Sequence, residues 1–326
     1  MIPFNSILLG FYPTPLTMLT SLTRHLAGPE IYIKRDDLTG LAFGGNKTRK
    51  LEFLLGDAKS KNCDTIITAG AQQSNHCRQT AAASALLGME CHLVLGGEEP
   101  SDFNGNLLLD KLFGAHLHYC GNLRKGEKIP EIVEQLKSNG KTPYIIPYGG
   151  SNSIGTLGFV GAVEELKIQM KDKSLQFSHI IFASSSGGTH AGLMVGKALY
   201  NIDTEILGIG IDKDEIEGMT LEKFIVKLAN TTARKLNLEM KFHKNDIYLN
   251  NNYLGEGYGI VGEAEKEAID LLARSEGILL DPVYTAKAMA GLIDLIRKQQ
   301  FDKKDKVLFW HTGGTPALFP CASKLV

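Results

Sequence analysis

The chain has 326 residues, of which 43% are hydrophobic and 22% are charged, proportions that are typical of a soluble globular protein. A formal net charge of −1 gives no electrostatic reason to expect a nucleic acid or an anionic membrane as a partner. No run of 18 apolar residues predicts a transmembrane helix. The first 23 residues contain no Lys or Arg and so lack the basic region of a secretory signal peptide.

The five cysteines favour reduced thiols in a cytoplasmic protein, because their number is odd and no Cys-x-x-Cys pair occurs. Two adjacent pairs, His76-Cys77 and Cys91-His92, contain ligand-type side chains, but metal ligands on one helix or loop usually have a wider spacing. We therefore expect no metal site.

Strands and helices are predicted to alternate through the first half of the chain. The predicted elements, in chain order, are a strand at 31–35, a helix ending near 60, a strand at 65–69, a helix at 78–87, a strand at 90–95, a helix at 107–113, a strand at 116–119, a helix at 129–139 and a strand at 144–147. Short apolar runs that end in glycine, such as the one before Gly70, are typical of buried parallel strands.

The same alternation continues in the second half. The predicted elements are a helix at 159–171, a strand at 179–183, a helix at 189–200, a strand at 205–211, helices at 221–236, 263–276 and 286–298, and a strand at 306–310. This order predicts an α/β fold in which parallel sheet is flanked by helices on both faces.

The most informative segment is Gly44-Gly45-Asn46-Lys47-Thr48-Arg49-Lys50, which leads into a strongly helical stretch. Two glycines allow a sharp turn and a close approach to a ligand. The positive end of the helix dipole, together with Arg49 and Lys50, disfavours the ammonium form of Lys47 and favours a neutral, nucleophilic amine. Such an amine can form a Schiff base with an aldehyde cofactor, although a surface lysine in a first helical turn is an equally good interpretation of this segment alone.

A run of hydroxyl and glycine residues lies between the strand at 179–183 and the helix that follows it. Backbone N–H groups at a helix N-terminus bind phosphate well, so this run predicts a phosphate site, with a purely structural turn as the alternative. The residues expected to hold the phosphate are Ser185, Ser186, Gly187, Gly188 and Thr189. The run is not a P-loop and matches the dinucleotide fingerprint poorly, although Asp212 lies near the right distance for a ribose contact.

Polar residues also follow the strand at 65–69, where ligands bind in open α/β sheets. Asn75 can hydrogen-bond a phenolate oxygen, and Ser74 can donate or relay a proton; alternatively, this segment caps the following helix. Farther along, Tyr258 lies in a glycine-rich loop and Tyr284 precedes a helix. His311-Thr312-Gly313-Gly314 follows the last strand and places a hydroxyl at its end.

An imine-forming lysine, a phosphate loop and a strand-end hydroxyl together suit pyridoxal phosphate, which needs an amine, a phosphate cradle and a partner for its pyridine nitrogen. Gly44–Glu52, Gln73–His76, the serine loop, Asp281–Tyr284 and His311–Gly314 moreover resemble, in order, the motifs of the D-cysteine desulfhydrase and 1-aminocyclopropane-1-carboxylate (ACC) deaminase group. This group belongs to the tryptophan-synthase-β-like fold of pyridoxal-phosphate enzymes, and the resemblance spans nearly the whole chain.

The resemblance implies a role for each motif. Lys47 would carry the cofactor and move the Cα proton, Asn75 would bind the ring O3′, and Thr312 would meet the pyridine nitrogen. Ser74 would contact the substrate carboxylate or assist proton transfer, and Tyr258 and Tyr284 would flank the substrate. His76 and Thr285 would also belong to the substrate site.

The resemblance further implies two α/β domains with the cofactor between them. The smaller domain would comprise residues 47–154, and the larger would combine 1–46 with 155–326. A homodimer is also expected from the resemblance.

Three positions favour the desulfhydrase branch. Where this chain has Thr285 after Tyr284, the deaminases tend to carry glutamate, and where it has Thr312 after His311, they tend to carry leucine. They tend to carry glutamine where this chain has His76. A neutral hydroxyl at the pyridine nitrogen makes the cofactor a weaker electron sink than a carboxylate would. That suits β-elimination, in which the leaving thiolate carries away the electrons of the Cα carbanion.

The expected reaction is the conversion of D-cysteine and water to pyruvate, hydrogen sulfide and ammonia, and the partner is thus a small amino-acid substrate. Alternatives are an ACC deaminase or another pyridoxal-phosphate lyase of the group, such as one acting on L-cysteate. A dinucleotide-dependent oxidoreductase that uses Gly187, Gly188 and Asp212, and a non-catalytic amino-acid-binding relative, are less favoured.

Overall fold

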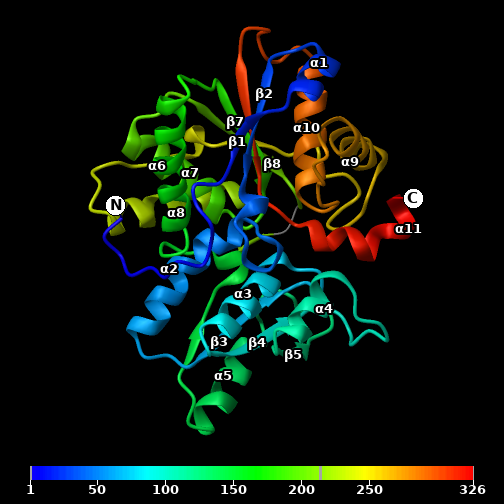
Figure 1. Cartoon of the computed structure of the whole chain (residues 1–326). Coiled ribbons are helices and arrows are strands. Elements are labelled where there is room, and N and C mark those ends of the chain that lie inside the picture. Colours follow the sequence, from blue (N-terminus) through cyan, green and yellow to red (C-terminus); the bar gives the residue numbers. More distant parts are fainter. Residues whose placement is uncertain (1, 213–214, 326) are drawn as a thin grey trace.

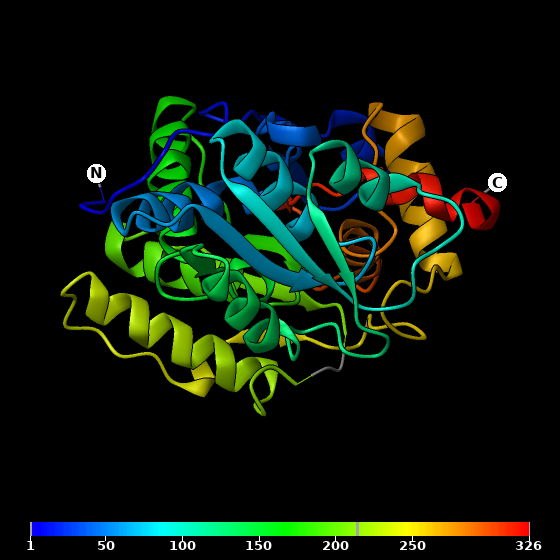
Figure 2. The same cartoon turned by 90° about the horizontal axis from the view of Figure 1, so that it is seen from below.

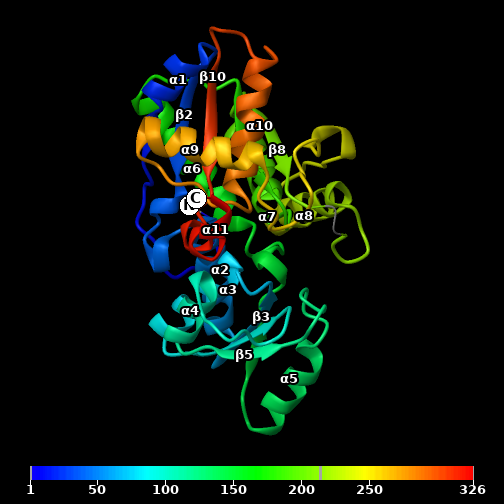
Figure 3. The same cartoon turned by 90° about the vertical axis from the view of Figure 1, so that its right-hand side faces the viewer.

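The computed structural model describes residues 2–212 and 215–325. Its two sheets form two bodies, one above the other in Figures 1 and 3. No helix of the described residues is long and apolar enough to cross a membrane.

The larger sheet has six strands in the order β1-β2-β10-β7-β8-β9, and all are parallel to their neighbours except β1 at one edge. Its strands are β1 (Leu16–Met18), β2 (Glu30–Arg35), β7 (His179–Ser184), β8 (Glu205–Gly210), β9 (Tyr248–Asn250) and β10 (Lys306–His311).

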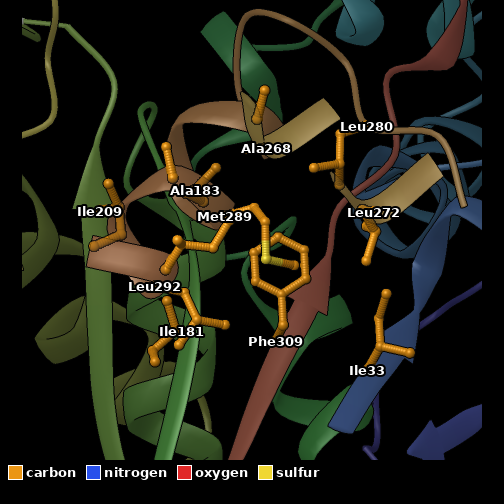
Figure 4. Close-up of a cluster of buried hydrophobic side chains, with 14 of the residues drawn as sticks. Ile33, Ile181, Ala183, Ile209, Ala268, Leu272, Leu280, Met289, Leu292 and Phe309 are labelled. Atoms are coloured by element: carbon orange, nitrogen blue, oxygen red, sulfur yellow. The ribbon is translucent and has the colours of Figure 1, made fainter. Parts of the chain in front are cut away.

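Helices cover both faces of this sheet because its central strands are apolar on both sides. Along β10, Val307 and Phe309 point to one face, and Leu308 and Trp310 point to the other. One face packs against α1 (Thr20–Leu26), α9 (Glu263–Glu276) and α10 (Thr285–Arg297), where Met289 and Phe309 lie at the centre of the core (Figure 4). The other face packs against α6 (Leu157–Asp172), α7 (Gly188–Tyr200) and α8 (Leu221–Lys235).

The smaller sheet is parallel throughout, in the order β5-β4-β3-β6. Its strands are β3 (Thr65–Gly70), β4 (Glu90–Leu95), β5 (His116–Tyr119) and β6 (Pro143–Ile145). One face packs against α2 (Asn46–Ser60), α3 (Asn75–Leu86) and α4 (Gly105–Leu112), and the other against α5 (Ile129–Ser138), which lies in front of the sheet in Figure 2. Short 3₁₀ helices and α11 (Ala322–Leu325) complete the chain; the 3₁₀ helices are Asp36–Leu38, Leu41–Phe43, Tyr148–Gly150, Lys244–Asp246 and Thr315–Cys321.

The structure confirms the predicted α/β fold with helices on both faces of mainly parallel sheets, as well as each strand and helix predicted from sequence. Helix α3 starts three residues before the predicted Arg78, because Ser74 caps it by accepting a hydrogen bond from the Cys77 N–H. The antiparallel strand β1, helix α1 and strand β9 were not predicted, because each is too short for a clear periodic pattern.

A buried ion network fixes the start of α2 against the larger sheet. The Arg49 guanidinium donates to both carboxylate oxygens of Asp36 at 2.8 Å and to Glu165 of α6 at 2.9 Å. Trp310 of β10 donates its indole N–H to the same Asp36 carboxylate, and Lys34 pairs with Glu165. Burial opposes ionisation of Glu165, but Arg49 and Lys34 outweigh it and lower its pKa to about 2. The network therefore joins four elements of the larger body, β2, the 3₁₀ helix Asp36–Leu38, α6 and β10, to α2.

Replacing Arg49 should destabilise the protein strongly. In Arg49→Met, two buried carboxylates lose their main counter-charge, and we expect the free energy of unfolding in urea to fall by about 3–5 kcal/mol. Arg297→Met is the matched control, since it breaks a half-exposed pair with Glu267 and should change the free energy by about 1 kcal/mol or less. Equal effects of the two substitutions would show that the buried network does not anchor α2.

Candidate functional site

A cavity opens where the carboxyl ends of strands from both sheets meet, which is where parallel α/β sheets bind ligands. The empty space within it, with the open mouth included, is about 610 Å³. It is lined by Asn46, Lys47, Ser74, Asn75, His76, Tyr148, Gly149, Ala183, Ser184, Ser185, Ser186, Gly187, Thr189, His190, Tyr284, Thr312 and Gly313.

Most of the residues that sequence analysis selected therefore meet at one cavity. They lie as many as 265 positions apart in the chain, the distance from Lys47 to Thr312. Three of the selected residues are not on its wall. Gly188 begins helix α7 just behind the serine loop, Tyr258 contacts the cavity through Tyr284, and Thr285 points to a buried aspartate.

Lys47 is the second residue of α2, and its amine lines the cavity. Burial lowers the pKa of Lys47 to about 8, so a substantial fraction of the amine is neutral near neutral pH. The pKa of Lys47 is lowered, as the sequence analysis expected, but the physical cause is a different one. Arg49 is bound to carboxylates elsewhere, and the interaction with Lys50 raises the pKa of Lys47 rather than lowering it. Desolvation is therefore what activates this amine.

Lys50 lies one helical turn farther along α2 and is fully enclosed. Its amine donates to the carbonyl of Gly149 at 3.1 Å and to the hydroxyl of Ser151 at 3.3 Å. Burial and the charge of Lys47 lower the pKa of Lys50 well below its usual range. A Cβ added to Gly188 would fall 2.9 Å from the Lys50 amine, so the start of α7 and this cation lie against each other.

The serine loop has the geometry of an anion cradle. Gly187 adopts a positive φ of 78°, which glycine accepts readily, and it turns the chain directly into the N-terminus of α7. Ser151 donates to Ser186 at 2.8 Å, and the Gly188 N–H donates to Ser151 at 3.2 Å. The N-terminus of α7 and the nearby Lys50 amine lie at this end of the cavity, and the positive end of the helix dipole favours an anion there.

The amide of Asn75 is held in one orientation. Its Oδ1 accepts from Arg78 at 3.0 Å and from the Asn106 side chain at 2.9 Å, so its NH₂ group is the part left for the cavity. Arg78 also donates to the Gly44 carbonyl, which ties the glycine loop to the same support. Sequence analysis missed Arg78 and Asn106, because neither lies in a motif that contacts the cavity.

His76 is held neutral by its burial, which lowers its pKa well below the usual value. The Thr68 hydroxyl gives its one proton to the Ile146 carbonyl and must therefore accept from His76 Nε2 at 2.9 Å. The other ring nitrogen, Nδ1, then carries a lone pair, and it is buried without a partner. His76 can thus accept a hydrogen bond at Nδ1 but cannot donate one from it.

Two tyrosines form a pair beside the cavity. The hydroxyls of Tyr258 and Tyr284 are hydrogen-bonded, and their rings meet edge to face with centroids 5.8 Å apart. The Arg124 guanidinium stacks on Tyr258, 4.6 Å above the ring centroid. Burial raises the pKa of Tyr258 to about 12 and that of Tyr284 well above its usual value, so both are protonated at neutral pH.

The loop after β10 closes the cavity on the side of the glycine loop. The Thr312 carbonyl accepts from the Asn46 N–H at 2.9 Å, while the Thr312 side chain lines the cavity. A Cβ on Gly313 would lie 2.6 Å from the Cα of Gly45, so glycine at 313 is needed for the two loops to touch. The lysine and the threonine hydroxyl are thereby held at a fixed separation.

Several lining residues were not predicted, among them Asn46, Tyr148, Ser184 and His190. Tyr148 lies three residues after the end of β6, so the strand-end rule applied to that strand would have found it. Asn46 donates to the Thr189 hydroxyl at 3.1 Å and links the two predicted loops, a contact that sequence cannot reveal. Asp212, which would serve a dinucleotide, is not among the described residues that line this cavity.

Comparisons with known proteins agree with this arrangement. The family model for the pyridoxal-phosphate dependent enzyme matches residues 7–313. D-cysteine desulfhydrase of Klebsiella pneumoniae (strain 342) is 45% identical over 313 residues, covering 94% of this chain and 93% of the relative, and the Salmonella typhi D-cysteine desulfhydrase is 44% identical over the same length.

A crystal structure of an ACC deaminase homologue superposes with a TM-score of 0.90 at 39% identity, covering 99% of this chain and 96% of the other. Both the match to the family model and the identity to these relatives extend over nearly the whole chain. The chain therefore belongs to the family of pyridoxal-phosphate dependent enzymes.

Proposed function

We propose that this enzyme catalyses the α,β-elimination of D-cysteine, which with water gives pyruvate, hydrogen sulfide and ammonia. The observation that carries the proposal is the 45% identity to a D-cysteine desulfhydrase over almost the full length of both chains. The chemistry of the cavity supports it, because a neutral amine, an anion cradle and hydroxyl donors surround one space.

The residues present fit pyridoxal phosphate. A phosphate group suits the end of the cavity where the serine loop, the N-terminus of α7 and the Lys50 amine converge. We propose that Ser185, Ser186, Gly187, Gly188 and Thr189 hold the phosphate, largely through backbone N–H groups, and that Lys50 balances its charge. Binding a phosphate dianion there would also compensate the burial of the Lys50 amine.

Lys47 is proposed as the amine that binds the cofactor and later moves the Cα proton. When bound, pyridoxal phosphate supplies an aldehyde that reacts with amines and a ring that withdraws electrons from the neighbouring carbon. A neutral Lys47 amine can attack an aldehyde and can accept a proton, and its pKa of about 8 serves both tasks near neutral pH. Its position on the rigid first turn of α2 keeps it within the cavity.

We propose that the other residues in and beside the cavity wall orient the cofactor ring and the substrate. The NH₂ group of Asn75, directed by Arg78, would donate to the ring O3′. Ser74 and the protonated pair Tyr258 and Tyr284 would contact the substrate carboxylate or the leaving sulfur, with His76 completing that side. Tyr258 and Tyr284 would act as donors, because burial keeps both hydroxyls protonated.

Thr312 is proposed to meet the pyridine nitrogen with a neutral hydroxyl. No carboxylate lines the cavity among the residues that the structure describes. Asp281, which lies against Gly314, accepts from the Thr285 hydroxyl at 2.8 Å and from the N–H groups of Val283 and Tyr284 at 3.0 Å. Thr285 thus acts by holding this aspartate and the start of α10. A modest electron sink suits a substrate with a good leaving group such as thiolate.

Introducing a carboxylate at position 312 tests this proposal. Thr312→Glu should lower kcat for sulfide release from D-cysteine by about tenfold or more, because an added charge changes the ring's protonation. Thr312→Ser keeps the hydroxyl and should retain most of the activity. A glutamate variant that turns over cysteine faster than the parent enzyme would sink the idea.

The substrate is tested with a panel of amino acids and matched product assays. We expect sulfide and pyruvate from D-cysteine at a kcat/KM at least about 100-fold above that for L-cysteine, since the two enantiomers cannot both direct the Cα proton at Lys47. Release of 2-oxobutanoate from ACC, or of sulfite from L-cysteate, measures the alternative activities in the same preparation. The structural similarity to an ACC deaminase homologue makes ACC the second candidate. Preferred turnover of ACC or L-cysteate would replace the proposal.

We also propose a division into a small domain of residues 47–154 and a large domain of 1–46 with 155–326, supported by the positions of the two sheets.

A homodimer and a cytoplasmic location are further proposals. Exposed apolar side chains at Leu8, Phe11 and Phe43 offer surface that a second copy can cover, and sedimentation of the purified protein tests this. All five cysteines are free thiols, as a reducing compartment would leave them.

A further inference from the structure

A cluster of three histidines and one glutamate lies on the smaller sheet, away from the cofactor cavity. Glu90 and His116 are the first residues of β4 and β5, and His92 is directly opposite His116 in the parallel register. The cofactor cavity is reached from the carboxyl ends of the strands, so this cluster occupies the other end of the sheet. Both strands belong to the lower body in Figure 1.

The side chains point to the sheet face that carries α5, but they lie beyond the apolar contact of that helix. In β4, Cys91 and Leu93 face α3 and α4, so the alternating residues Glu90 and His92 face the opposite side. Apolar packing on that side uses Val94 from the same strand. Nothing in the proposed elimination chemistry uses the cluster.

The ligand-type atoms converge. His92 Nε2 lies 2.9 Å and His116 Nε2 lies 3.5 Å from the same oxygen of Glu90. One ligand atom from each of the three residues lies within 4.8 Å of the others. The His92 and His116 rings are stacked with centroids 4.6 Å apart and an interplanar angle of 16°, so both edges face the carboxylate.

Two further side chains, His118 and Lys141, contact the cluster. The remaining nitrogen of His92, Nδ1, is 2.9 Å from Nε2 of His118, so His118 can accept the Nδ1 proton when His92 binds an ion through Nε2. The other carboxylate oxygen of Glu90 pairs with Lys141, a cation that competes with a metal ion for this carboxylate. His92 is buried, whereas the side chain of His116 is 57% exposed, so an ion has a path from solvent.

We propose that Glu90, His92 and His116 bind a divalent transition-metal ion such as Zn²⁺, with a fourth coordination position left to water. Two imidazoles and one carboxylate are a ligand set that zinc accepts in tetrahedral geometry. The bound ion would cross-link the edge strand β5 to β4.

This inference departs from our expectation that the chain has no metal site. The adjacent pair Cys91-His92 had been set aside because neighbouring residues rarely bind one ion. In a strand, neighbours point to opposite faces, and the residues that meet are those two apart or across the ladder. Glu90 and His92 satisfy the first condition, and His116 satisfies the second.

Calorimetric titration of the chelator-treated, cofactor-loaded enzyme with Zn²⁺ tests the site. We expect one ion per chain, and His116→Ala should weaken its binding by at least about tenfold, since an exposed ligand is lost without disturbing the core. His25→Ala removes an exposed histidine elsewhere and should leave the affinity unchanged. Equal affinity in His116→Ala and the parent enzyme, or equal losses in both variants, would overturn the proposal.

Two further variants separate ion binding from general destabilisation. Lys141→Gln removes a cation that competes for Glu90 and should tighten Zn²⁺ binding several-fold. His118→Gln removes the ring that contacts His92 Nδ1 and should weaken Zn²⁺ binding by about tenfold. Zn²⁺ should also raise the thermal midpoint of the parent enzyme but not that of His116→Ala. Weaker binding in Lys141→Gln would contradict the assignment. Sulfide release from D-cysteine by His116→Ala should be unchanged, so failure of this site leaves the proposed function untouched.

Discussion

The buried contact between Arg49 and the carboxylates of Asp36 and Glu165 sets the position of everything else in the site. Arg49 lies on the face of α2 turned toward the larger sheet. Lys47 and Lys50, two residues before it and one after it, lie three apart and share another face of the helix. Fixing the guanidinium in its carboxylate pocket therefore fixes the rotation of the helix. With that rotation fixed, both amines are directed into the space between the two sheets.

Placing two amines in that space has an electrostatic consequence. In the described part of the chain neither amine pairs with a carboxylate; Lys50 donates to a carbonyl and a hydroxyl, and burial lowers the pKa of both lysines. A cavity with buried amines and the N-terminus of a helix suits a polyanionic, aldehyde-bearing cofactor better than a cationic or apolar ligand. The same features that destabilise the cofactor-free cavity thus provide the affinity and the nucleophile. Thr312 is placed beside that space by loops that glycines at 45 and 313 allow to touch, and Asn75 is held there by Arg78 and Asn106.

Sequence predicted the elements and most of the wall of this cavity for a physical reason. Parallel strands end at one edge of a sheet, so polar residues after β3, β7 and β10 had to gather there, and Ser74, Ser185 and Thr312 do. The sequence could not predict contacts between side chains of distant elements. The roles of Arg78 in orienting Asn75 and of Asn46 in reaching Thr189 depend on packing, and no local pattern encodes them. The low pKa of Lys47 was expected from charge and helix dipole, yet it arises from burial, which only the folded chain determines. The histidine cluster was missed because spacing was judged as for a helix, while its residues lie on strands.

The central claim is that a desolvated Lys47 amine holds the cofactor. Borohydride trapping of pyridoxal phosphate on the cofactor-depleted enzyme, followed as a function of pH and mapped by peptide mass spectrometry, tests it most directly. The account predicts a pyridoxyl label on Lys47, with trapping that rises as pH increases through a midpoint of about 8, because the neutral amine forms above its pKa. A label on Lys50, or a midpoint at the ordinary pKa of an exposed lysine, would contradict the account.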